Sequence, residues 1–133
     1  MKLSFIIIDD RELDCYIAEK LIQKTGLSVN NEVFYDAVSA LDFIKISAPT
    51  DQITIVLLDI MMPVMNGFQF IEEFEKLPQE VKNNYRIIPI TTSLNKNDIN
   101  KISNYESVIG VLKKPYTFEA LVKTIQTIQE DLG

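Results

Sequence analysis

The sequence has no histidine and only one cysteine, and both shortages exclude whole classes of chemistry. Without histidine there is no histidine-based catalytic triad and no histidine-ligated metal site. Cys15 has no second cysteine with which to form an internal disulfide, which fits a reducing cytoplasm. A lone cysteine within a helical pattern is most often a small buried apolar residue, and we expect the same of Cys15.

An excess of positive charge and long apolar runs are also missing. The net charge of −6 argues against direct binding of nucleic acid and against a role at the membrane surface. No apolar run approaches the roughly 20 residues of a membrane-spanning helix. The start, Met1–Phe5, is followed too soon by Asp9 and Asp10 to be a signal peptide. We therefore expect a cytoplasmic protein.

The length and composition are typical of one soluble domain. The chain has 133 residues, of which 47% are apolar and 24% charged, enough to bury a single core. We expect residues 1–133 to form one domain. The chain starts at Met1 and ends just after the last predicted helix, so we expect a stand-alone protein, with excision from a longer protein as the alternative.

Short apolar runs alternate with segments of helical periodicity along the chain. The predicted strands are Leu3–Ile8, Val33–Tyr35, Ile53–Leu58, Ile87–Thr91 and Val108–Leu112. The predicted helices are Arg11–Thr25, Ala37–Ile46, Phe68–Leu77, Lys96–Asn104 and Thr117–Asp131. Five strand–helix units with short connections predict a doubly wound α/β fold, in which helices cover both faces of a parallel sheet.

Two of these elements carry a specific expectation. The periodicity of the first helix places its large apolar residues on one face, namely Leu13, Tyr16, Ile17, Leu21 and Ile22. Pro89 lies within the fourth predicted strand, where a proline would lose a hydrogen bond of the sheet. We expect a local irregularity at Pro89 rather than a different fold.

Polar side chains follow four of the predicted strands. Asp9 and Asp10 follow the first, Asp59 the third, Thr91 ends the fourth, and Lys114 comes shortly after the fifth. In an open parallel sheet, ligands bind beyond the carboxyl ends of the strands, so we expect these groups to share one site. Clustered carboxylates repel one another unless a divalent cation joins them, and a purely oxygen ligand set selects a hard ion such as Mg²⁺. A carboxylate beside Mg²⁺ can attack phosphorus, with a lysine and a threonine hydroxyl left to bind the phosphoryl oxygens.

The residues around these strand ends resemble one known family. The matching motifs are Ile8-Asp9-Asp10, Leu58-Asp59-Ile60-Met61-Met62-Pro63 through Asn66-Gly67, Ile90-Thr91 and Lys114-Pro115. Together they resemble the response-regulator receiver domain of two-component signalling, in particular its chemotaxis-regulator-like single-domain members, and the resemblance covers essentially the whole chain. It implies a five-stranded sheet of order 2-1-3-4-5 flanked by five helices, a flavodoxin-like three-layer sandwich.

The resemblance also implies a role for each motif residue. Asp59 would be the phosphoacceptor, and Asp9, Asp10, Asp59 and the backbone carbonyl of Met61 would bind Mg²⁺, with Mn²⁺ as an alternative. Thr91 would be the switch hydroxyl, Lys114 would pair with the phosphoryl oxygens, and the Lys114–Pro115 bond would be cis. The phosphoryl donor would be a histidine kinase or a histidine phosphotransfer protein. Phosphorylation would change partner binding through residues 87–112, which include the helix Lys96–Asn104.

Three positions depart from the family pattern. Val111 stands where an aromatic residue usually reports the state of the switch, so we expect Thr91 to act without a moving ring. Met61 is apolar where polar side chains are common, and we predict that it shields Asp59 from water and prolongs phosphorylation. Thr92 replaces a smaller residue and is expected to narrow access for phosphate.

Other interpretations compete with this one. In one alternative, the sole role of Asp9 and Asp10 is to cap the following helix, and the sole role of Thr91 is to form a turn. An aspartate-dependent phosphatase usually needs a second acid two residues after its nucleophile, where this chain has Met61, so we expect a signalling switch and not an enzyme. A flavin carrier would need a phosphate-binding loop in place of Asp9–Glu12. The main alternative is a degenerate receiver that binds partners without phosphorylation. We expect a monomer or weak dimer, with an unidentified downstream protein partner.

Overall fold

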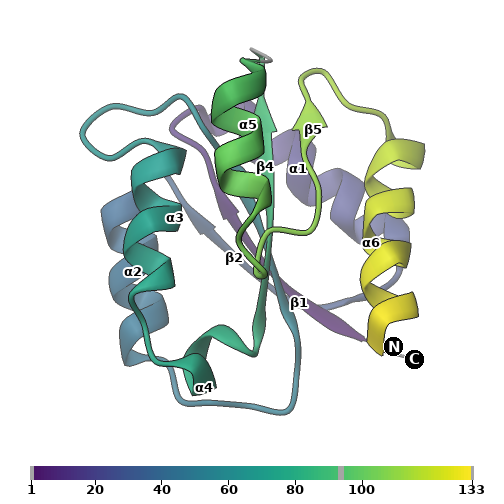
Figure 1. Ribbon diagram of the computed structural model, residues 1–133. Coiled ribbons are helices and arrows are strands. Elements are labelled where there is room, and N and C mark those ends of the chain that lie inside the picture. The colour runs from purple at the N-terminus through teal and green to yellow at the C-terminus, as the bar shows by residue number, and fades with distance from the viewer. Residues whose placement is uncertain (1, 93–94, 133) are drawn as a thin grey trace.

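The structure is a computed structural model that describes residues 2–92 and 95–132. Its centre is a sheet of five parallel strands in the order β2-β1-β3-β4-β5, as the sequence predicted. The strands are β1 (Leu3–Ile8), β2 (Ser28–Phe34), β3 (Thr54–Asp59), β4 (Tyr85–Thr91) and β5 (Leu112–Lys113). All four strand pairs are parallel, so all five carboxyl ends lie at one edge of the sheet (Figure 1).

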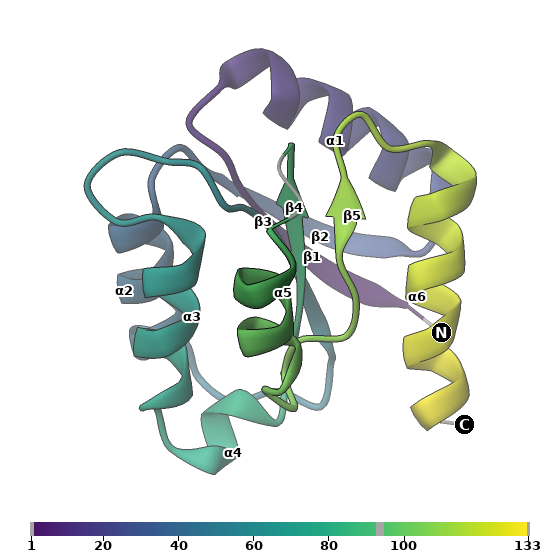
Figure 2. The same ribbon diagram turned by 45° about the horizontal axis from the view of Figure 1, so that its top comes forward.

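Helices cover both faces of this sheet. They are α1 (Glu12–Thr25), α2 (Ala37–Ile46), α3 (Gly67–Glu75), α4 (Gln79–Lys82), α5 (Lys96–Ser103) and α6 (Phe118–Leu132). One apolar cluster joins the sheet to α2, α3 and α5, and the other joins it to α1 and α6, on opposite sides of the sheet (Figure 2). This is the predicted three-layer arrangement. No helix in the described part of the chain combines the length and apolarity needed to cross a membrane.

The prediction of five helices was one short. The single turn α4 follows Pro78, the residue directly after the predicted helix Phe68–Leu77. Pro78 is the residue immediately before α4, and its carbonyl accepts hydrogen bonds from the backbone N–H groups of Val81 and Lys82. A proline ends one helix and can equally begin the next, because its fixed φ suits the start of a helix. A four-residue helix is too short to show a period in the sequence.

The central strands are buried on both faces, as continuous apolar runs predict. In β1, Phe5 and Ile7 point toward α1 and α6, while Ile6 and Ile8 point toward α2 and α3. The alternation follows from the two-residue repeat of a strand. These side chains anchor the end of β1 and so fix the position of the acidic residues that follow it.

The face that α1 turns to the sheet differs from the predicted stripe. The buried residues of α1 are Cys15, Ala18 and Ile22, and of these the prediction included Ile22. Leu13, Tyr16 and Ile17 are instead 69%, 58% and 46% exposed. Small side chains let a helix pack close to a sheet, so Cys15 and Ala18 occupy the contact, whereas the prediction followed the larger apolar residues. Cys15 is buried, as expected.

The irregularity expected at Pro89 lies in the neighbouring segment. β4 is continuous through Pro89, which pairs in register with Leu58. The backbone N–H of Ile87 donates to Ser107, and Ile109 donates back to Ile87. In a parallel ladder the next hydrogen bond would run from residue 89 to the Ile109 carbonyl, and proline has no N–H to donate. The predicted strand 108–112 is accordingly reduced to an isolated bridge at Val108 and the two-residue β5.

The outer strand β2 begins earlier than predicted. It extends from Ser28 instead of Val33, and it includes Asn30, Asn31 and Glu32. These polar residues hid the strand from a search for apolar runs, but an edge strand with partly exposed side chains accepts them. The pairing with β1 shifts by one residue near Val29, which is the position of a bulge.

Candidate active site at the carboxyl ends of the strands

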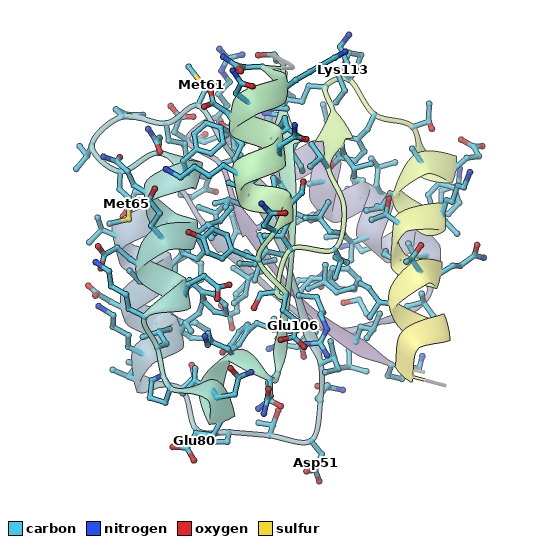
Figure 3. All side chains as sticks on the ribbon, in the orientation of Figure 1. Asp51, Met61, Met65, Glu80, Glu106 and Lys113 are labelled. Carbon is cyan, nitrogen blue, oxygen red and sulfur yellow. The ribbon has the colours of Figure 1, made fainter. Side chains whose placement is uncertain are left out.

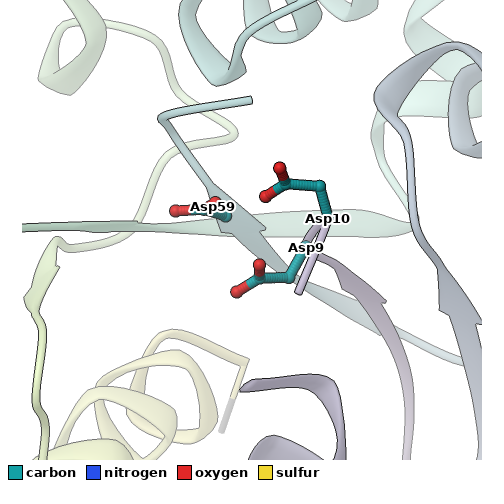
Figure 4. Close-up of side chains that lie close together, drawn as sticks. All are labelled: Asp9, Asp10 and Asp59. Atoms are coloured by element: carbon teal, nitrogen blue, oxygen red, sulfur yellow. The ribbon is translucent and has the colours of Figure 1, made fainter. Parts of the chain in front are cut away.

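Three carboxylates lie together where β1 and β3 end. One oxygen from each of Asp9, Asp10 and Asp59 lies within 4.8 Å of the others (Figure 4). Asp9 and Asp59 are 6% and 7% exposed, whereas Asp10 is open to solvent. The sequence analysis expected this proximity because parallel strands present their carboxyl ends together, and in the structure β1 and β3 are adjacent and parallel.

The loop after Asp59 is held in place by its backbone. The N–H of Ile60 donates to the Ile90 carbonyl at 3.0 Å, and the N–H of Gly67 donates to the Ile60 carbonyl at 2.9 Å. Asn66 caps α3, exchanging side-chain and backbone hydrogen bonds with Gln69 in a complete capping box. The loop therefore leaves β3 and returns beside it, which keeps the phosphoacceptor candidate Asp59 at a rigid junction.

Asp9 and Asp10 do not cap α1. The residue at the cap position is Arg11, and its side chain makes no capping hydrogen bond. Asp9 Oδ1 accepts from the backbone N–H of Arg11 at 3.0 Å, one residue before the helix begins. Capping alone therefore does not explain two consecutive carboxylates at this position.

Lys114 lies at the centre of the acidic group. Its Nζ is 2.8 Å from Asp9 Oδ2, 3.0 Å from Asp14 Oδ2 and 3.4 Å from Asp59 Oδ1. The Lys114–Pro115 peptide bond is cis, as the family resemblance implied. The backbone N–H of Lys114 donates to the Thr91 carbonyl at 2.8 Å, so the end of β5 is tied to the end of β4.

Burial and neighbouring charges shift the ionisation of the site. Desolvation, reinforced by the charge of Asp9 and opposed by Lys114, raises the pKa of Asp59 from 3.8 to about 6. Burial by itself would lower the pKa of Lys114, but hydrogen bonds to Asp9 and Asp14 and the charge of Asp59 raise it on balance. The lysine is therefore a fixed positive charge, and Asp59 is mostly ionised at neutral pH.

The remaining predicted residues lie around this centre. Thr91 is 3% exposed at the end of β4. The carbonyl of the preceding residue, Ile90, accepts a hydrogen bond from the Ile60 N–H, and the Thr91 carbonyl accepts one from the Lys114 N–H. Thr92 and Pro115 are exposed, and Val111 is half-buried in the segment before β5. Met61 is 65% exposed and lies at the same end of the molecule as Lys113, with Asp51 at the opposite end (Figure 3).

Asp14 is a site residue that the sequence analysis missed. It lies in the first turn of α1 and contacts Lys114, although α1 comes from the opposite end of the sequence. A cleft of about 320 Å³ extends from Asp59 and Lys114 past Asp14, with an apolar wall that includes Ala18 and Leu21 of α1. The available signal was spacing: a helix that starts at Glu12 brings Asp14 back over the end of β1.

Comparison with known proteins identifies the family of this arrangement. A family model for the response regulator receiver domain matches residues 5–126. The chain belongs to this family. The site described above follows from the receiver fold, because the fold brings together the strand ends that carry the acidic residues and Lys114.

Three similar proteins illustrate the likeness. A response regulator receiver protein from Dyadobacter fermentans DSM 18053 is 31% identical, with a TM-score of 0.81 over 93% of this chain and 95% of that one. A two-component response regulator from Cytophaga hutchinsonii is 23% identical, with a TM-score of 0.85 over 98% and 99% of the two chains. The regulatory protein VanRc from Enterococcus gallinarum is 30% identical over 76 residues, which are 57% of this chain and 30% of VanRc. The matched segment is thus less than a third of VanRc.

Proposed function

We propose that this receiver domain is a phosphorylation-controlled switch in which Asp59 accepts a phosphoryl group from a phosphohistidine. The donor would be a histidine kinase or a histidine phosphotransfer protein. The observation that carries this proposal is the position of Asp59, a buried carboxylate 3.4 Å from Lys114 and clustered with Asp9 and Asp10.

The transfer uses Asp59 as a nucleophile. A carboxylate oxygen of Asp59 attacks phosphorus in line with the N–P bond of the donor, a new O–P bond forms, and the imidazole leaves with the electron pair of the N–P bond. With a pKa of about 6, Asp59 is ionised and nucleophilic at neutral pH. Lys114 offsets the negative charge on the phosphoryl oxygens, and the Thr91 hydroxyl donates a hydrogen bond to one of them.

The residues present fit a bound Mg²⁺. Asp9, Asp10 and Asp59 offer three carboxylate oxygens within 4.8 Å of one another, and the backbone carbonyl of Met61 would complete the protein ligands. Hard oxygen ligands of this kind suit Mg²⁺, and Mn²⁺ accepts the same set. When bound, the cation would neutralise charge on the phosphoryl group during transfer.

The output would pass through β4, β5 and α5. Thr91 and Lys114 are joined by a backbone hydrogen bond, and β5 pairs with β4 over only two residues, so this edge is weakly held. Because Val111 is not aromatic, we infer that a shift of Thr91 moves the backbone around α5 directly. Structures with and without beryllofluoride that share the same backbone over residues 91–112 would contradict this route.

We also infer that the protein is a signalling switch and not an enzyme with turnover. Its reaction ends at phosphorylated Asp59, and attack of water on phosphorus then breaks the O–P bond, releases inorganic phosphate and restores the carboxylate. Met61 offers no second acid to speed that hydrolysis. Signalling then depends on contact with a protein partner, and the net charge of −6 makes nucleic acid an unfavourable direct partner.

Titration with beryllofluoride and Mg²⁺, followed by NMR, tests the proposal. The native protein should show Mg²⁺-dependent shifts that spread from Asp59 to Thr91, Lys114 and α5. The variant Asp59→Asn should show none of them. Asp51→Asn makes the same chemical change at the opposite end of the molecule and should respond like the native protein (Figure 3). A native protein that does not respond would instead be a degenerate receiver with partners that bind regardless of phosphorylation.

A further inference from the structure

Among the described residues, Lys114 has three carboxylate partners, and two of them belong to the candidate cation site. Asp9 and Asp59 are members of the clustered triad, whereas Asp14 is not. The ammonium of a lysine has three N–H donors, so Asp9, Asp14 and Asp59 can each accept one. The contact to Asp14, at 3.0 Å, is only slightly longer than the 2.8 Å contact to Asp9, and both are within hydrogen-bond distance.

The two functions of Asp9 conflict when a cation is bound. Asp9 Oδ1 already accepts from the Arg11 N–H, and Asp9 Oδ2 accepts from Lys114. If Asp9 and Asp59 bind a divalent cation, they lose much of their attraction for Lys114, which the cation also repels. Lys114 is largely buried, with a side chain only 18% exposed, and it then needs a carboxylate outside the cation site.

We propose that Asp14 is this carboxylate. It is a positioning residue that keeps Lys114 beside the active site while Asp9, Asp10 and Asp59 hold Mg²⁺, and from there the ammonium reaches the arriving phosphoryl group. Asp14 is suited to this role because it projects from the first turn of α1, a rigid element, and its side chain is 29% exposed and shares the cleft with Lys114. This inference rests on the proposed function.

A simpler role for Asp14 has to be separated from this one. Acidic residues in the first turn of a helix are favoured by the helix dipole, and α1 has two of them, Glu12 and Asp14. Glu12 is exposed and is not one of the three carboxylates around Lys114. The variant Glu12→Gln therefore removes the same charge from the same turn and serves as the matched control.

The test is a double-mutant cycle on the affinity for Mg²⁺ alone, measured by calorimetry or by amide NMR shifts. We expect Asp14→Asn to weaken Mg²⁺ binding by about three- to tenfold more than Glu12→Gln does, because it leaves Lys114 competing for Asp9 and Asp59. In a Lys114→Gln background, Asp14→Asn should have no more effect than Glu12→Gln. Asp14→Glu should restore most of the affinity.

A second measurement follows the lysine itself. At saturating Mg²⁺, the NMR signal of the Lys114 ε-methylene should move in Asp14→Asn and stay in place in Glu12→Gln. An equal loss of affinity with and without Lys114 would overturn the inference and leave Asp14 as a simple charge. Native protein that binds no Mg²⁺ would overturn the proposed function as well, so the two failures are distinguishable.

Discussion

Gly67 lies directly against Ile60. A Cβ atom on Gly67 would be 2.5 Å from Ile60 Cδ1, 2.7 Å from Ile60 Cα and 2.9 Å from the Asp59 carbonyl oxygen. Two of these three atoms belong to the backbone, which cannot move aside as a flexible side chain can. The glycine eight residues after Asp59 is therefore required by the close return of the loop to the end of β3.

The first prediction concerns this contact. Gly67→Ala should destabilise the protein by about 1–3 kcal/mol and displace the loop from Asp59, because the methyl group overlaps Ile60. Gly110→Ala should cost less, since its Cβ would meet only the Thr124 side chain, at 3.1 Å. Urea unfolding measures both variants. Equal stability of native protein and Gly67→Ala would show that the loop relaxes freely.

The second prediction concerns pH. Burial raises the pKa of Asp59 from 3.8 in the unfolded chain to about 6, so ionised Asp59 destabilises the fold. Relative to Asp59→Asn, the native protein should lose stability as pH rises from about 4 to about 6, by up to roughly 3 kcal/mol. Above that range the difference should stay constant. Urea unfolding across this range measures it, and a flat difference throughout would contradict the raised pKa.

Mg²⁺ provides the third prediction, which is linked to the second. A cation held by the three carboxylates binds the folded state and should stabilise native protein at neutral pH. Removing Mg²⁺ with a chelator should abolish the gain. Asp59→Asn should gain much less, whereas Asp51→Asn, with the same change far from the site, should gain as much as the native protein. A thermal unfolding series in increasing Mg²⁺ gives the comparison.

The fourth prediction concerns Val64, which has a φ of 69° and is 94% exposed. The Met65 N–H donates to the Pro63 carbonyl at 2.9 Å across it, which forms a three-residue turn that strains a β-branched residue. Val64→Asn should stabilise the protein by about 0.5–1 kcal/mol, because asparagine tolerates positive φ. The same change at Val29, an exposed strand residue, should not stabilise it. Thermal unfolding of Val64→Asn and of Val29→Asn measures the two changes in stability.

The fifth prediction concerns the lifetime of phosphorylated Asp59. Met61→Asn should shorten this lifetime several-fold, because a polar side chain would help to orient the attacking water, whereas methionine shields Asp59 from water. Val64→Asn changes an exposed residue of the same loop and serves as the control. The decay of phosphorylated protein after removal of the donor measures the rate. A native protein that decays as fast as Met61→Asn would show that Met61 gives no shielding.

The sequence was sufficient to predict the fold and most of the site. Apolar runs that end at charged residues mark buried parallel strands, and parallel strands present their ends at one edge. Asp9, Asp59 and Lys114 could therefore be placed together although they are far apart in the chain. The cis bond before Pro115 followed from the family resemblance.

What the sequence did not predict depends on packing distances. The contact of Asp14 with Lys114 and the choice of Cys15 and Ala18 as the buried face of α1 both depend on how closely that helix approaches the sheet. β5 is short because residue 89 would donate its N–H to the segment on that side of β4, and proline has no N–H to donate. Periodicity identifies an element, but it does not fix the rotation of a helix or the partner of each amide.

The shape of the sheet edges has a consequence for behaviour at high concentration. At one edge, β5 offers only two residues for pairing, and at the other, β2 carries Asn30, Asn31 and Glu32 together with a bulge near Val29. Neither edge presents a long, flat, apolar template onto which a strand of another molecule could add. The irregularity that Pro89 imposes therefore also protects the folded protein against aggregation by sheet extension.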